Sequence, residues 1–531
     1  MNSKKFFIKT GSEEFDNLFS IVKGFLEKDK LDIVIDSKNI SGYRSPDAKS
    51  IWIRDYSDMI RGFKYFEKDL FSTINHFAET QGENGRIFDY FTTFPEKLPC
   101  ERENWTKYVR VPVEADVEYR FIKAAFLAWQ ASGDDEFILT LLPKMVKALL
   151  YIMNHPWYWE KKYNLVKRAY TIDTWDFAYT AGKHNWLQFQ INKKTYWGIM
   201  HGDNSGYYQA FRIITLLCKY FNQDANFGIW AEKADIIKKA MNKICWNGKF
   251  YKHFVKLTPV TIKNVDEAEQ LSLSNPMDIN RGVTSTAQAR LIIEEYIKRK
   301  ESSDAFAEWF SIDPPFPDGI FGDDKLKGGA YVNGGIMPLV GGELAKAAFD
   351  NGYERYGVDI LRRYYNLIIE KGETYLWYFP DGTPPTVDTS TSPEAEPTDG
   401  WGSSAMLYAL VEGLAGVEDI EKLFQKVKLS PRWIAAGINS AEVQINYGSS
   451  GSSIGYNFSN KKNYLQVEVF CNKSDILFHI LLPEKSIVKK TTMENKVIPH
   501  KLNDIGESRY VDFRQTVADR AKIKIELKGV R

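Results

Sequence analysis

The chain has 531 residues, too many for one ordinary hydrophobic core, so its length predicts two or more domains or one large barrel with an added module. Its 70 Lys and Arg residues balance 69 Asp and Glu residues, and a formal net charge of +1 argues against nucleic acid or an anionic membrane as the partner. Aromatic residues make up 14% of the chain, which suits either a large core or surfaces that stack on sugar rings.

The N-terminal residues 1–17 contain only a two-Phe apolar patch, so they do not form a signal peptide, and the chain has no apolar run of 18 residues. The sequence as given therefore predicts a cytoplasmic protein, unless a signal has been removed from its start. The cysteines are scattered, which argues against a disulfide framework or a zinc site, and no metal or other cofactor is expected. They are Cys100, Cys218, Cys245 and Cys471.

The apolar pattern is helical from about residue 115 to 415, and residues 1–50 are expected to form an N-terminal extension. Segment 115–132 has apolar stripes on two sides, whereas 136–155 has one stripe, and the same alternation returns at 203–222 and 228–245. A helix with two apolar sides lies between layers, and a helix with one stripe has a face in water. Other segments with helical character lie at 12–28, 55–65, 67–80, 283–299, 335–350, 353–371 and 401–415.

Alternating inner and outer helices predict a mainly α protein, an (α/α)6 double helical barrel at 51–418. A helical solenoid would show a fixed repeat length, and none is present. Long loops that are rich in aromatic residues separate the helices, and loops of this length inside a compact domain are usually functional. They cover 82–112, 156–202, 247–280, 312–333 and 373–400.

The apolar period changes from helical to two after about residue 420. Residues 441–448, 465–471, 475–482 and 521–527 alternate between apolar and polar side chains, with turn residues between them. This pattern predicts an antiparallel β-sandwich module at 419–531.

The acid segment, residues 170–181, reads YTIDTWDFAYTA and places Asp173 and Asp176 on either side of Trp175. A carboxyl group beside an apolar ring can have a raised pKa, as the general acid of a glycoside hydrolase requires. The alternative is that both aspartates cap a short helix or a turn.

The early segment, residues 50–62, reads SIWIRDYSDMIRG. Arg54 and Asp55, next to Trp52, could bind adjacent sugar hydroxyls by charge-assisted hydrogen bonds. An ion pair at the start of a helix is the alternative.

The late segment, residues 377–406, is an acidic Pro/Ser/Thr loop that leads into a helix starting near Trp401. Asp399 is expected to be the N-cap of that helix. Glu394 and Glu396 are candidates for a catalytic base, or members of a solvated acidic loop. In GGAYVNGGIMPL at 328–339, Tyr331 and Asn333 precede paired glycines that would let the backbone approach a ligand closely.

The order of these segments resembles that of the six-hairpin glycosidases, the clan of the glucoamylases (glycoside hydrolase family 15) and, more loosely, of rhamnosidases and disaccharide phosphorylases. The W-x-R-D motif of glucoamylases, which binds the terminal sugar, is matched by Trp52, Arg54 and Asp55. Their D-x-W-E segment, whose Glu is the general acid, falls on Asp173–Asp176, with Asp in place of Glu. The catalytic base lies in a P-E loop before the last long helix, which Pro393-Glu394 fits, although the spacing to Trp401 is compressed.

This resemblance implies an exo-acting, inverting glycosidase with Asp176 as the general acid and Glu394 or Glu396 as the base. Trp52, Arg54, Asp55, Asp173, Trp175, Tyr331, Asn333 and Trp401 would bind an oligosaccharide or glycoside. Glycoside phosphorylase, uronide-acting hydrolase or lyase, and non-catalytic sugar-binding protein remain alternatives. The sugar, its linkage and the oligomeric state are open.

Overall fold

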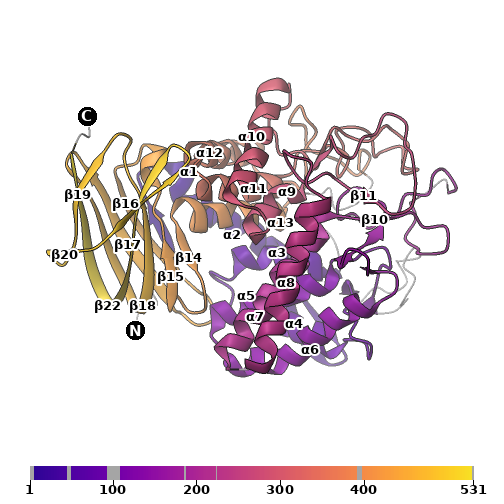
Figure 1. Ribbon diagram of the computed structural model, residues 1–531, viewed down its shortest axis with the longest axis horizontal. Helices are drawn as coiled ribbons and strands as arrows, with labels where there is room; N and C mark the ends of the chain where they lie inside the picture. The colour runs from indigo at the N-terminus through magenta and orange to yellow at the C-terminus, as the bar shows by residue number, and fades with distance from the viewer. Residues whose placement is uncertain are drawn as a thin grey trace.

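The computed structural model of the protein describes residues 5–44, 50–92, 108–184, 187–222, 224–390 and 397–528. A helical part occupies the centre, a β-rich part lies at its left, and irregular loops gather at its right (Figure 1). The helices are α1 (Glu13–Asp16), α2 (Leu18–Asp29), α3 (Ile53–Phe63), α4 (Ser72–Glu79), α5 (Val117–Ser132), α6 (Asp135–Asn154), α7 (His201–Tyr220), α8 (Asp224–Ile244), α9 (Ser274–Arg281), α10 (Thr286–Ser302), α11 (Pro338–Asp350), α12 (Glu354–Lys371) and α13 (Gly400–Tyr408), which continues as a π-helix, η3 (Ala409–Leu414).

Six of these helices contact one another in a closed cycle. Helix α3 contacts α5, and the cycle continues through α7, α9, α11 and α13 back to α3. Helix α11 shows why they lie inside, because every residue from Pro338 to Phe349 is buried. Small residues make this contact possible: a Cβ on Gly342 would lie 2.3 Å from the backbone of Ala405 in α13.

The alternate helices lie outside this cycle and each contacts an inner neighbour. Helix α6 packs on α5, α8 on α7, α10 on α9 and α12 on α11. Helix α10 buries only one stripe, formed by Ala289, Ile292, Ile293 and Tyr296. The alternation between two-sided and one-sided helices therefore corresponds to inner and outer positions.

Helix α9 was not expected, since all but its last residue falls within the predicted loop 247–280. It has only eight residues, contains Pro276 and has a mostly polar sequence, SNPMDINR, so few apolar residues mark it as a helix. It is nonetheless an inner helix, and Ser274–Ile279 are buried. Tertiary contacts with α7 and α11 thus hold a segment that lacks a strong helical pattern of its own.

The C-terminal residues form most of a ten-stranded sheet. Its strands are β1 (Phe7–Lys9), β14 (Val417–Asp419), β15 (Lys426–Leu429), β16 (Ser440–Asn446), β17 (Ser453–Lys461), β18 (Tyr464–Leu481), β19 (Ile487–Met493), β20 (Lys496–Ile498), β21 (Lys501–Ile505) and β22 (Ser508–Lys528). The main order is β1-β16-β17-β18-β22-β19-β20.

Two expectations for this sheet need correction. The segments 465–471 and 475–482 are not separate strands but one strand, β18, whose register against β22 shifts between Cys471 and Ser474. The sheet is also not wholly antiparallel, because β15 pairs with β18 in parallel. The shift lets β18 pair with β17 in its first half and with β15 in its second half.

The N-terminal extension contacts both parts of the molecule. Helix α2 packs on α3 and α13, while β1 pairs with β16 at the edge of the large sheet. A hairpin of β2 (Lys30–Ile35) and β3 (Lys38–Tyr43) follows and contacts α4. Further short strands lie in the loops: β4 (Ser50–Trp52), β5 (Tyr90–Thr92), β6 (Tyr108–Val109), β7 (Trp159–Glu160), β8 (Leu165–Val166), β9 (Arg168–Ala169), β10 (Trp197–Ile199), β11 (Val255–Lys256), β12 (Leu271–Ser272) and β13 (Ile312–Asp313).

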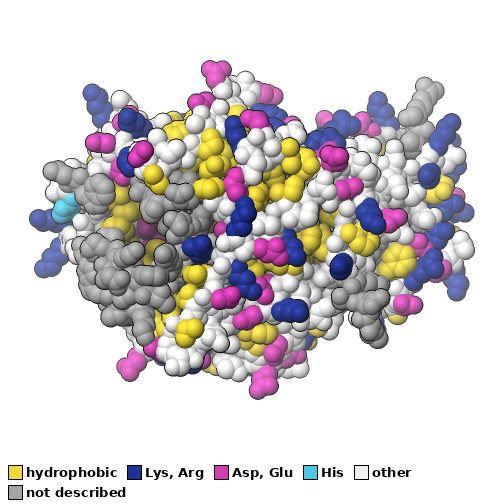
Figure 2. All heavy atoms as spheres, turned by 180° about the vertical axis from the view of Figure 1, so that it is seen from behind, with side chains coloured by type: hydrophobic (Ala, Val, Ile, Leu, Met, Phe, Trp, Pro, Cys, Tyr) yellow, Lys and Arg dark blue, Asp and Glu magenta, His cyan; other side chains and the backbone are white. Residues whose placement is uncertain are grey.

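Across the described ranges, no helix is both long enough and apolar enough to cross a membrane. Figure 2 shows one face of the molecule, on which acidic and basic side chains are interspersed. This mixture agrees with the near-zero net charge of the chain.

Candidate functional site

The connections between helices are short at one end of the helical part and long at the other end. The chain passes from inner to outer helices through short turns, such as 133–134 and 282–285, but returns through long segments, such as 155–200 and 303–337. Because an outer helix separates each inner pair, the inner helices run in the same direction and their N-terminal ends meet under the long loops. The positive ends of helix dipoles favour carboxylates there.

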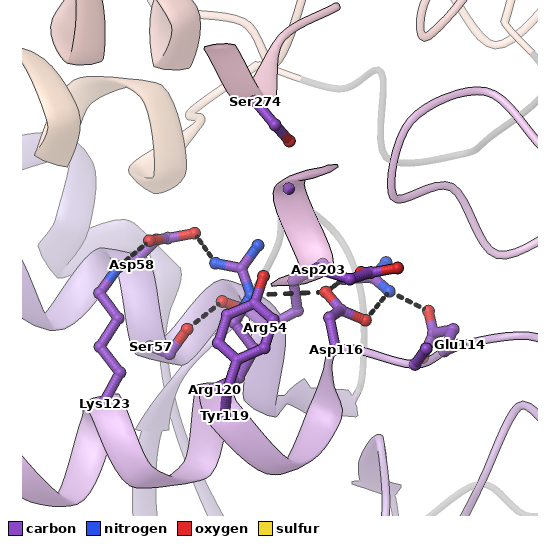
Figure 3. Close-up of polar contacts among 12 residues, drawn as sticks. Arg54, Ser57, Asp58, Glu114, Asp116, Tyr119, Arg120, Lys123, Asp203 and Ser274 are labelled. Carbon is purple, nitrogen blue, oxygen red and sulfur yellow. Dashed lines mark hydrogen bonds and ion pairs between the residues drawn. The ribbon is translucent and has the colours of Figure 1, made fainter. Parts of the chain in front are cut away.

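Arg54, in the first turn of α3, is held by two carboxylates that precede α5. Its Nε and Nη2 donate to the two oxygens of Asp116 at 3.0 and 2.9 Å, and Nη2 also donates to Glu114 at 2.5 Å (Figure 3). The Arg54 side chain keeps 16% of its surface exposed. Burial would lower the pKa of Arg54, but Asp116, Glu114 and Asp176 together hold it well above its ordinary value.

Asp176 therefore lies close enough to Arg54 for their charges to interact, although 121 positions separate them in the sequence. Asp176 is partly exposed, whereas the neighbouring Trp175 is buried. The centroid of the Trp175 ring lies 4.5 Å from that of Phe177 and 5.7 Å from that of Phe321. The structure thus brings the early segment and the acid segment together.

Asp173 has a different environment, because it is fully buried and its side chain is used within the chain. Its carboxylate accepts hydrogen bonds from the hydroxyl of Ser274 at 2.7 Å and from the Ser274 N–H at 3.2 Å, at the start of α9. Its own N–H donates to His253, and its φ is +44°. Asp173 thereby fixes the acid segment to an inner helix that is distant in sequence, and its contact with substrate stays a prediction.

The late segment meets the early segment at the start of α13. Asp399 is confirmed as the N-cap, since it accepts from the N–H groups of Trp401 at 3.0 Å and Gly402 at 2.7 Å. Burial raises the pKa of Asp399 to about 7; those two hydrogen bonds lower it, and the charge of Asp55 raises it. Asp55 is therefore near the N-cap of α13.

Trp401 is partly exposed, and its indole N–H donates to Asp58 at 2.7 Å. Asp58, in α3, is buried and also binds Arg120 and Lys123 of α5. Burial would raise the pKa of Asp58, but Arg120, Lys123 and Arg61 hold it well below its ordinary value. Burial lowers the pKa of Lys123 to about 7, although Asp58 opposes the change.

The remaining predicted contacts lie in the loops that cover this end. The ring of Trp52 stacks on that of Tyr90 at 3.9 Å. Tyr331 is partly exposed, has a φ of +46°, and its ring lies 6.4 Å from that of Trp175. Asn333 is buried, and its amide bonds to the backbone of Phe316 and Leu326, so it braces the loop that carries Tyr331. Contact of these residues with a sugar stays a prediction.

Glu394 and Glu396, the candidates for the base, lie outside the described residues. After them, Thr398 and Asp399 at the start of α13 both donate backbone hydrogen bonds to the carbonyl of Thr374.

Sequence reasoning missed several charged residues at this end, namely Asp58, Glu114, Asp116, Arg120, Lys123 and Asp203. A signal was available: Arg120 and Lys123 stand in a helix that is apolar on two sides, where a charged side chain needs a buried partner. Asp203, in the first turn of α7, lies beside Asp116 (Figure 3). Burial raises the pKa of Asp203 to about 7; Arg168 lowers it, and Asp116 and Asp173 raise it.

The described residues contain no group of three or more His, Cys, Asp or Glu side chains placed to hold a metal ion. Cys218, Cys245 and Cys471 are buried. The groups gathered at this end are carboxylates, guanidinium groups and aromatic rings.

Comparison with known proteins finds no protein family and no curated protein that matches by sequence. Solved structures do match. The α-L-rhamnosidase from Dictyoglumus thermophilum aligns with 98% of this chain and 50% of its own length, at 14% identity and a TM-score of 0.59. The α-L-rhamnosidase of Streptomyces avermitilis, solved with L-rhamnose, covers 98% of this chain and 42% of its own length, at 11% identity and a TM-score of 0.58.

A GH63 mannosylglycerate hydrolase from Thermus thermophilus covers 74% of this chain and 99% of its own length, at 13% identity and a TM-score of 0.51. The chain thus spans half or less of the length of the two rhamnosidases. Its fold is that of glycoside hydrolases that combine a large helical part with β domains. The matches point to rhamnosidases and GH63 enzymes, and the likeness to glucoamylases stays an expectation from the motifs.

Proposed function

We propose that this protein is a glycoside hydrolase with an (α/α)6 barrel, which removes a terminal sugar from an oligosaccharide or glycoside with inversion. One observation carries the proposal. Asp176 and Arg54, from two segments that each resemble a glycosidase motif, are close enough for their charges to interact at the loop-covered end of the inner helices. The shared fold of the matching glycoside hydrolases supports the same conclusion.

In this mechanism Asp176 holds the proton that passes to the oxygen of the leaving group as the glycosidic bond breaks. The ring of Trp175, the residue before Asp176, packs against those of Phe177 and Phe321, so the segment that carries the acid is rich in aromatic contacts. Glu394, with Glu396 as the other candidate, removes a proton from the attacking water. Inversion requires the two carboxyl groups to stand roughly 6.5–9.5 Å apart, whereas retention requires about 5–5.5 Å.

Asp55 and the exposed edge of Arg54 bind hydroxyls of the terminal sugar, and Trp401 offers an apolar face to its ring. Arg54 already faces two carboxylates, Glu114 and Asp116, so it has no excess positive charge for a substrate carboxylate. This balance favours a neutral sugar over a uronide.

A screen of aryl glycosides and oligosaccharides, with the product anomer followed by NMR, tests the proposal. We expect release of a single terminal sugar whose first-formed anomer is opposite to that of the substrate, at a rate independent of phosphate. Phosphate-dependent turnover would instead identify a phosphorylase. Sugar binding without turnover of any substrate would identify a binding protein.

A further inference from the structure

A continuous chain of buried charges joins Arg54 to Trp401. The Trp401 indole donates to one oxygen of Asp58 at 2.7 Å, and Arg120 binds that same oxygen. The Nε of Arg120 then donates to Asp116 at 3.4 Å, and Asp116 binds Arg54 through both of its oxygens. Figure 3 shows the part from Asp58 to Glu114, with positive and negative groups alternating.

Arg120 is the centre of this chain, because its guanidinium contacts both Asp58 and Asp116. It lies one turn into α5 and is only 1% exposed, so it has no access to substrate. A guanidinium presents five donors in a fixed plane and can bind two carboxylates at once, whereas an ammonium acts as a single point charge. The two anions that it bridges stand in different elements, one in α3 and one just before α5.

We propose that Arg120 is a positioning residue that fixes Trp401 and Arg54 relative to each other through Asp58 and Asp116. The aromatic face and the guanidinium edge then form one rigid unit, although they stand on α13 and α3. That this unit receives a sugar rests on the proposed function, whereas the mechanical link between its ends does not.

The alternative is that these ion pairs only neutralise buried charge, each pair independently of the next. In that case a change at Arg54 has no effect on Trp401. The two views therefore differ in one measurable quantity, the response of Trp401 to a substitution at the opposite end of the chain of charges.

The experiment uses the full-length protein labelled with 5-fluorotryptophan and observed by ¹⁹F NMR, with the Trp401 signal assigned by its loss in Trp401→Phe. We expect Arg54→Lys, which keeps the charge but loses the two-point contact with Asp116, to shift the Trp401 signal by more than its line width. In an Arg120→Lys background, the same Arg54→Lys substitution should leave the Trp401 signal in place.

Arg61→Lys is the matched control, since Arg61 is another buried arginine, and it faces Asp58 and Glu343 rather than Asp116. In that background the response to Arg54→Lys should persist. The proposal is wrong if Arg54→Lys does not shift the Trp401 signal in the otherwise native protein. It is also wrong if Arg54→Lys still shifts that signal in the Arg120→Lys background. The first of these outcomes is available even if Arg120→Lys fails to fold.

A kinetic arm uses the aryl glycoside that the enzyme turns over fastest. The effects of Arg54→Lys and Trp401→Phe on kcat/KM should deviate from multiplicativity by about threefold or more in the native background, and they should become multiplicative with Arg120→Lys. If no glycoside is turned over, the proposed function fails while the NMR result still decides the role of Arg120.

Discussion

At the scale of residues, the site depends on how differently its carboxylates are surrounded. Asp116 is ionised between two guanidinium groups, and although burial would raise its pKa, Arg54 and Arg120 hold it below the ordinary value. Asp173 is buried, and its carboxylate binds the start of α9. Asp176 is partly exposed, follows Trp175 in the sequence, and lies near enough to Arg54 for their charges to interact. Of the aspartates of the acid segment, only Asp176 thus keeps access to solvent and to a substrate.

Replacing Asp176 by Asn should remove the general acid while keeping the shape of the side chain. We expect a loss of about 10²–10⁴-fold in kcat with an unactivated glycoside. The loss should be smaller with an aryl glycoside whose leaving group needs little protonation. Steady-state kinetics on both substrates provides the measurement, and equal losses on both would point to Asp173 or to a structural defect.

Asp55→Asn should weaken binding of the terminal sugar in both the ground state and the transition state. The loss of one charged hydrogen bond to substrate costs roughly 1.5–3 kcal/mol. We therefore expect kcat/KM to fall about 10- to 150-fold for the preferred glycoside. Unchanged KM and kcat would show that Asp55 makes no contact with the sugar.

At the scale of elements, the inner helices contribute residues to the site from their N-terminal ends. Arg54 and Asp55 lie in the first turn of α3, Asp203 lies in the first turn of α7, and Asp399 caps α13. Side chains in the first turn project toward the same end of the molecule as the loops that precede them. The long loops and the helix starts therefore build the site together.

Asp399→Asn tests the burial of the α13 cap through the dependence of stability on pH. Asp399 titrates near 3.8 in the unfolded chain and near 7 in the folded protein. Between these values the folded state holds a proton that the unfolded state has lost, so this group reduces stability as pH rises from about 4 to 7.

Asparagine is also a good N-cap but does not titrate. The unfolding free energy of Asp399→Asn relative to wild type should therefore rise by roughly 1.4 kcal/mol per pH unit across this window and then level off. Denaturant unfolding from pH 4 to 8 measures it, with Asp134→Asn at the exposed N-cap of α6 as the matched control. A difference that does not vary with pH would contradict the burial of a proton at Asp399.

The loop that precedes α13 should carry the base. Glu394→Gln or Glu396→Gln should lower kcat by about 10²–10⁴-fold, depending on which residue activates water. Azide needs no deprotonation, so it should restore turnover in the inactive variant and give a glycosyl azide of inverted configuration. Trapping of a covalent glycosyl-enzyme would instead establish retention.

At the scale of the whole molecule, the helical part and the large sheet share one continuous hydrophobic core, which includes both Leu344 of α11 and Leu527 of β22. Polar contacts join the two parts as well: Arg432 binds Asp350 at 2.8 Å, and the hydroxyl of Tyr456 donates to the carbonyl of Ala415 at 2.7 Å. The N-terminal strand β1 closes this arrangement by pairing with β16.

Because the core is shared, we expect the helical part and the sheet to unfold together. Differential scanning calorimetry should show one transition, and circular dichroism bands for helix and strand should be lost at the same temperature. Two resolved transitions would mean that the sheet is an independently stable domain. Arg432→Met, which breaks the pairing with Asp350, should lower the temperature of that single transition.

The sequence by itself was sufficient for the features that depend on local periodicity. Inner and outer helices differ in the number of apolar stripes, and the sequences of segments such as 115–132 and 136–155 show this difference. The Asp399 cap and the change to strands after residue 420 are likewise local signals. Helix α9 was not predicted because its eight residues are mostly polar and include a proline, and β18 was divided into two strands because a register shift interrupts its alternation.

Only the tertiary structure decided which charges meet. Arg54, Asp116 and Asp176 are far apart in the sequence, and no local pattern says that α3 and α5 bring the first two within 3 Å of each other. The sequence also could not show that Asp173 is buried against α9 while Asp176 is left partly exposed. The physical reason is that electrostatic interactions act through space, so their partners are set by the closed cycle of inner helices, whereas helix and strand formation follows from neighbours along the chain.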